Sequence, residues 1–85
     1  MKINKTHILT NICYTELVYQ RINKKLNIKL SKQEIENFIF KILKETDEKY
    51  FLRIGKNFYI TNNKYNTRLT INSSTCRIIT ADRIK

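Results

Sequence analysis

The sequence has no proline, no tryptophan and a single glycine, Gly55, among its 85 residues. Flexible linkers are usually rich in glycine, serine or proline, so this composition predicts one domain over residues 1–85. No apolar run approaches the roughly 20 residues that cross a bilayer as a helix. The charged N-terminal stretch also lacks the apolar core and cleavage site of a secretory signal peptide. We therefore expect a cytoplasmic protein without a membrane-spanning segment.

Cysteine and histidine are also scarce. Cys13 and Cys76 are the two cysteines, and His7 is the one histidine. Two distant cysteines do not form a disulfide framework, and together with one histidine they supply too few ligands for a zinc site. We expect two reduced thiols, no bound metal and no cofactor.

Acidic residues are few compared with basic ones. Lys and Arg number 17 against 7 Asp and Glu, which gives a net charge of +10. A field of this sign concentrates polyanions at the surface. The expected partner is nucleic acid, with RNA favoured, or a nucleoprotein complex. The alternatives are an acidic protein surface as the partner, and a charge that serves solubility alone. The abundance of Ile, Lys, Asn and Tyr is typical of AT-rich genes, so the arginines are better evidence than the lysines.

The first half of the chain has helical periodicity. Residues 15–26 place apolar side chains on one face, with Thr15 as a possible N-cap. Residues 31–43 begin with the capping-box pattern Ser31 to Glu34. An apolar stripe follows at helical spacing, formed by Ile35, Phe38, Ile39, Ile42 and Leu43. Residues 6–12 are expected to form no more than a short extra turn.

The second half has the period of strands. The strands are predicted at residues 50–54, 57–61, 67–72 and 75–81, and Gly55-Lys56 is a turn signal between the first two. The sequence therefore predicts an α+β fold with two helices packed on one face of a four-stranded antiparallel sheet, in the order ααββββ. The oligomeric state is left open, although charged strand edges disfavour pairing between copies.

Strand alternation suggests a binding surface. If Leu69 and Ile71 face the helices, then Arg68, Thr70 and Asn72 face away from them. We expect the neighbouring strand to place Arg77 beside these residues. Cations with an aromatic residue among them suit phosphates and unstacked bases, whereas an ordinary solvated sheet face is the competing interpretation. The candidate binding residues are Arg21, Lys56, Tyr59, Arg68, Thr70, Asn72, Arg77 and Arg83.

Motifs of known catalytic sites are missing. The sequence has no Walker loop, GxGxxG, HExxH or GxSxG pattern, and His7 lies outside the best-defined elements. We assign no catalytic residue. An endoribonuclease toxin that acts without metal stays as the alternative function, because Lys, Arg and Tyr alone can stabilise a strained phosphate.

Several segments in a fixed order carry a family resemblance. They are Tyr14-Thr15-Glu16-Leu17, Arg21-Ile22, Gly55-Lys56-Asn57-Phe58-Tyr59, Leu69-Thr70-Ile71-Asn72 and Ile78-Ile79-Thr80-Ala81. In these segments the chain resembles the small bacterial domain-of-unknown-function family numbered 3781. Two helices before an antiparallel sheet are also similar to the fold of barnase–colicin–RelE type ribonuclease toxins.

The resemblance also has functional implications. It implies histidines where this chain has Cys13 and Asp82, and a copy without them is better suited to binding than to catalysis. A small basic binder is typical of phages and mobile elements. We therefore expect an anti-defence inhibitor, similar to an anti-CRISPR protein.

Overall fold

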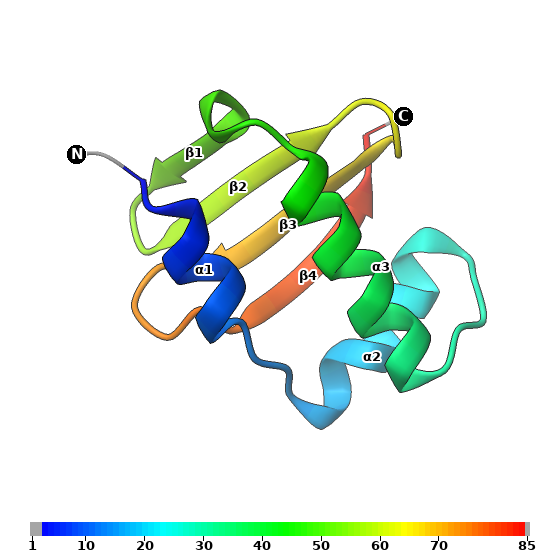
Figure 1. Cartoon of the computed structure of the whole chain (residues 1–85). Helices are drawn as coiled ribbons and strands as arrows, with labels where there is room; N and C mark the ends of the chain where they lie inside the picture. Colours follow the sequence, from blue (N-terminus) through cyan, green and yellow to red (C-terminus); the bar gives the residue numbers. More distant parts are fainter. Residues whose placement is uncertain (1–2, 85) are drawn as a thin grey trace.

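The computed structural model describes residues 3–84, which form three α-helices followed by one antiparallel sheet (Figure 1). The elements in chain order are α1 (Lys5–Asn11), α2 (Glu16–Leu26), α3 (Lys32–Glu45), the 3-10 helix η1 (Glu48–Tyr50), β1 (Phe51–Ile54), β2 (Asn57–Asn62), β3 (Thr67–Asn72) and β4 (Ile78–Arg83).

The predicted order ααββββ is wrong, because α1 is a helix and not a short turn. The Asn4 side chain caps it by accepting a hydrogen bond of 3.0 Å from the backbone N–H of His7. Ile8 is its buried residue and fixes it to the core. A helix of seven residues with one buried side chain leaves too short an apolar pattern to be recognised in the sequence.

The other two helices begin and end where their sequences indicate. Ser31 and Glu34 form the predicted capping box at the start of α3. Thr15 occupies the N-cap position of α2, but its side chain makes no capping hydrogen bond. Asn27 ends α2 in the left-handed conformation, with φ of 55°.

The sheet has the order β1-β2-β3-β4, and every neighbouring pair is antiparallel. Gly55, with φ of 61°, makes the turn that joins β1 to β2. The predicted start of the fourth strand near residue 75 is wrong, since β4 begins at Ile78. The reason is that Cys76 adopts a left-handed conformation with φ of 58°. A register shift between Thr70 and Ile71 marks a bulge between β3 and β4.

The core lies between the helices and one face of the sheet. Leu69 is the register partner of Ile60 on one side and Ala81 on the other, and all three are fully buried. Helices α1 and α3 cross in front of this face in Figure 1. They contribute Ile8 and the buried stripe of α3, which consists of Ile35, Ile39, Ile42 and Leu43.

Helix α2 runs alongside β4, in the same direction. Arg21 in the middle of α2 contacts the backbone carbonyl of Ile79 near the start of β4, and the carbonyl of Leu26 at the end of α2 contacts Arg83 at the end of β4. Thus, among the described residues, the helices cover one face of the sheet and one of its edges. No helix of this part of the chain covers the opposite face. No helix within residues 3–84 has both the length and the apolar character needed to span a membrane.

Candidate nucleic-acid interface

The sheet face turned away from the core is called the open face. Leu69 and Ile71 are fully buried beneath the helices, so the intervening side chains of β3 project from the open face. Arg68 is exposed there, as predicted from the alternation of β3. Thr70 is on the same side but only 7% exposed. It is a short side chain on an inner strand, between its cross-strand neighbours Tyr59 and Thr80.

A hollow of about 500 Å³ opens on this face. Tyr50, Leu52, Ile54 and Tyr59 form its apolar floor, and Arg68 lies at its side. The first three are large apolar side chains left 49%, 57% and 58% exposed. Exposed apolar groups gathered in one place, in contrast to scattered ones, are typical of binding sites. We call this feature the open-face hollow.

A lysine and a threonine complete the open-face hollow. Lys49 contributes to the lining, and its Nζ lies 5.3 Å from the centre of the Tyr50 ring. A cation at this distance is attracted to the ring face. Thr61 adds a hydroxyl group on the same strand as Tyr59. The hollow therefore combines aromatic, aliphatic and cationic groups.

The sequence predicts Tyr59 and Arg68 on this face, but not Lys49, Tyr50, Leu52 and Ile54. The positions of Leu52 and Ile54 can be derived from the sequence. The two-residue turn at Gly55-Lys56 fixes the register so that Leu52 lies opposite Tyr59. Leu52 and Ile54 must then project from the same face as Tyr59.

A second group of cations lies along α2. Arg21 and Arg77 line one shallow depression, and Arg21, Lys24 and Lys25 line the next. The exposed Leu17 borders both. We call Arg21, Lys24, Lys25 and Arg77 the α2 cation group. Arg77 thus belongs to this group, and its predicted position beside Arg68 is wrong.

Asp82 lies between the open face and the α2 cation group. It is the register partner of Arg68 across β3 and β4, and its Oδ1 lies 3.7 Å from Nζ of Lys25. Within the described strands β1 to β4, Asp82 is the one acidic residue. Asp82 therefore separates the cation at the open-face hollow, Arg68, from the cations along α2.

Contacts within the fold also involve predicted binding residues outside the open-face hollow and the α2 cation group. The Arg83 guanidinium donates to the carbonyl of Leu26. The Asn72 side chain accepts from the backbone N–H groups of Ser74 and Thr75, at 2.8 Å and 3.0 Å, and so shapes the β3–β4 turn. Lys56 lies in the β1–β2 turn, where its carbonyl accepts from Ser73 at 2.7 Å. Its exposed side chain is compatible with a binding role.

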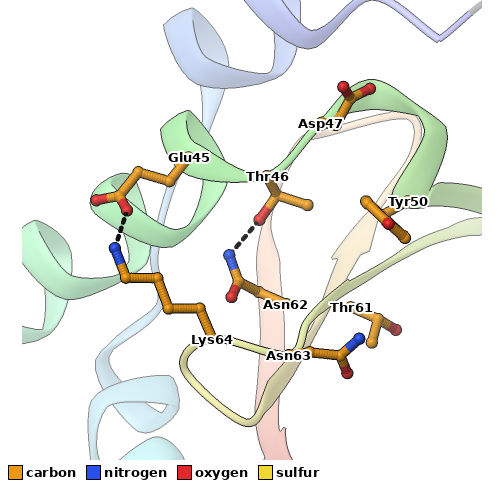
Figure 2. A pocket seen from close by; sticks show the side chains of 8 residues that line it. All are labelled: Glu45, Thr46, Asp47, Tyr50, Thr61, Asn62, Asn63 and Lys64. Atoms are coloured by element: carbon orange, nitrogen blue, oxygen red, sulfur yellow. Dashed lines mark hydrogen bonds and ion pairs between the residues drawn. The ribbon is translucent and has the colours of Figure 1, made fainter.

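A second pocket adjoins the open-face hollow, and Tyr50 and Thr61 line both (Figure 2). Its polar groups pair with one another. Buried Asn62 donates to Oγ1 of buried Thr46 at 2.8 Å, and Lys64 binds Oε1 of Glu45 at 3.1 Å. These contacts attach the β2–β3 turn to the end of α3. The hydrogen bonds from Lys64 and Tyr65 also hold the pKa of Glu45 below its ordinary value.

The most reactive side chains lie elsewhere. His7 is exposed on α1, and its Nδ1 is 3.3 Å from the side-chain nitrogen of Asn11. Cys13 is exposed and Cys76 is buried, and both are free thiols. Within residues 3–84, no three His, Cys, Asp or Glu side chains are grouped so that they could hold a metal ion.

Comparison with known proteins gives one match. The family described as "Protein of unknown function (DUF3781)" matches residues 6–82. No curated protein and no solved structure matches the chain.

Proposed function

We propose that this chain, which belongs to the DUF3781 family, is a small basic protein that binds nucleic acid, preferably RNA, through the open face of its sheet without cutting it. The observation that carries the proposal is the open-face hollow, where an exposed aromatic and aliphatic floor lies beside Arg68 and Lys49.

The chemistry of this surface matches a nucleic acid in two ways. Lysine and arginine side chains neutralise phosphates and release the counterions condensed on them. Aromatic rings in or beside a basic groove stack on bases. The open-face hollow offers both kinds of group, and the net charge of +10 favours encounter with a polyanion.

Binding is favoured over cleavage by the position of the one histidine. Proton transfer in phosphate chemistry requires an acid or base within hydrogen-bonding reach of the reacting oxygen. His7 is on α1, which lies over the covered face of the sheet. As the biological setting, we propose a cytoplasmic inhibitor from a phage or mobile element, similar to an anti-CRISPR protein. It would bind to the nucleic acid of a host defence complex.

A salt titration tests the binding proposal. The probe is a fluorescein-labelled single-stranded RNA of about 12 nucleotides, within the usual footprint of small single-strand binders. We expect affinity to fall steeply between about 50 and 200 mM salt, with a slope near −0.7 for each neutralised phosphate. A flat response would overturn the proposal.

Two charge-matched variants locate the site. Arg68→Gln removes a cation beside the open-face hollow, and Lys41→Gln removes an exposed cation from α3 on the other side of the sheet. We expect Arg68→Gln to weaken binding and to reduce the salt slope, and Lys41→Gln to do neither. A gel of the RNA after incubation tests the binding-only mode, because cleavage products would contradict it.

A further inference from the structure

We infer that the bound nucleic acid is single-stranded, with an unpaired base in the open-face hollow and its phosphates running across β3 and β4 to α2. The inference rests on the proposed function and specifies the form of its ligand. It is drawn from the apolar floor of the hollow and from the course of the cations that lead away from it.

The floor of the hollow requires an apolar ligand surface. Tyr50, Leu52 and Ile54 are each about half exposed, and the ring of Tyr59 adjoins them. In a duplex the faces of the bases are stacked on one another, and the outer surface is sugar and phosphate. Only an unpaired base presents a flat apolar face that can cover such a floor. The hollow therefore favours a single strand.

The cations then define a path from the hollow to α2. Arg68 is two residues from Thr70, which is the register partner of Tyr59. The side chains of Arg68 and Tyr59 are therefore diagonal neighbours about 7–8 Å apart. Arg68 in turn lies opposite Asp82, which contacts Lys25 of α2. The path crosses two strand spacings of about 4.8 Å each.

Helix α2 extends this path beside the sheet. Lys25 and Arg21 are four residues apart, so they lie on the same side of the helix, about 6 Å apart along its axis. Since α2 runs in the same direction as β4, Arg21 in the middle of the helix lies near the start of β4. There Arg21 and Arg77 line one shallow depression. The register partners of Tyr59 across β3 and β4 are Thr70 and Thr80. Their short side chains leave room for the nucleic-acid strand to cross the sheet.

The test compares two forms of one sequence. A labelled single strand of about 12 nucleotides and the blunt duplex made from it are titrated at the same salt concentration. We expect the single strand to bind at least about tenfold more tightly. Equal or tighter binding of the duplex would overturn the inference and leave the proposed function standing. Binding of neither would overturn both.

Variants of the floor provide the second arm. Tyr50 is exposed, so Tyr50→Ala should fold normally, and its melting temperature checks this. We expect roughly a 5- to 100-fold loss for the single strand, the usual effect of removing one stacking ring, and little change for the duplex. Tyr50→Phe keeps the ring and should bind like the parent. Equal losses for single strand and duplex, or an unaffected Tyr50→Ala, would contradict the stacked base.

The α2 cations provide the third arm. Lys25→Gln and Arg21→Gln should each reduce the salt slope for the single strand by about 0.7. Lys41→Gln should leave it unchanged. Unchanged slopes in both α2 variants would contradict the path to α2, while the binding measured for the parent protein would still support the proposed function.

Discussion

Arg83 donates two hydrogen bonds to the backbone carbonyl of Leu26, from Nη2 at 2.7 Å and from Nε at 3.2 Å. Leu26 is the last residue of α2 and Arg83 is the last residue of β4. Their contact joins the C-terminal end of the helix to the end of the strand beside it. It also satisfies one of the carbonyls that a helix leaves unpaired at its C-terminus.

The first prediction concerns this contact. Arg83→Met keeps much of the aliphatic stem but removes the donors, so we expect it to lower the free energy of unfolding by about 1–3 kcal/mol, because a charged hydrogen bond to a helix end is lost. Urea denaturation measures the change. Binding of the single strand at a temperature where the variant is folded should be nearly unaffected. A large loss of affinity at that temperature would indicate that Arg83 takes part in binding.

The second prediction concerns Asp82, the acidic residue on the proposed path. Asp82→Asn removes a negative charge between Arg68 and Lys25. We expect the affinity for the single-stranded RNA to rise about two- to fivefold, since a charge at a solvated surface is worth up to about 1 kcal/mol.

Glu36→Gln is the matched control for Asp82→Asn. It makes the same change in net charge on α3, and glutamine can still accept the hydrogen bond from Tyr19. An equal rise in both variants would mean that net charge, and not the position of Asp82, sets the affinity.

The third prediction concerns the buried polar pair in Figure 2. Asn62 donates to Thr46, and its Oδ1 accepts the backbone N–H of Tyr65 at 3.0 Å. Asn62→Ala should lower the free energy of unfolding by about 1–3 kcal/mol, because it leaves buried partners unsatisfied. Asn63→Ala, in the exposed turn beside it, is the control and should change stability little. A similar loss in both variants would contradict a specific role for Asn62.

The fourth prediction concerns acid stability. Hydrogen bonds from Lys64 and Tyr65 lower the pKa of Glu45 from its ordinary value of 4.5. A carboxyl group whose pKa is lower in the folded state stabilises the fold above the unfolded pKa, and this contribution is lost as the pH falls through the folded pKa. The melting temperature of the parent protein should therefore fall as the pH is lowered below about 4.5. The melting temperature of Glu45→Gln should fall less. An identical decline in the parent and Glu45→Gln would contradict the assignment.

Much of the fold is predictable because it depends on local patterns. The capping box at Ser31 and Glu34 and the apolar stripe that follows determine α3 without reference to the rest of the chain. The alternation of Thr67–Asn72 likewise determines which side of β3 is buried. The sequence does not reveal helix α1, because the contacts of Lys5, Ile8 and Leu9 that hold it are with distant parts of the chain.

The binding surface was predictable only in part, for a different reason. Tyr59 and Arg68 follow from alternation within their own strands. The partner of Arg83, in contrast, is 57 residues away in sequence, and the position of Arg77 depends on how α2 packs beside β4. Such contacts arise from tertiary packing, which the local pattern of residues does not encode.

Nuclear magnetic resonance offers the most direct test of the proposed interface. Isotope-labelled protein is titrated with the single-stranded RNA of about 12 nucleotides, and the shifts of the backbone amides are mapped onto the structure. We expect the largest shifts around Tyr50, Tyr59, Arg68 and Lys25, along the open face and α2. Shifts confined to α1 and α3, or no shifts at low salt, would contradict the proposed interface.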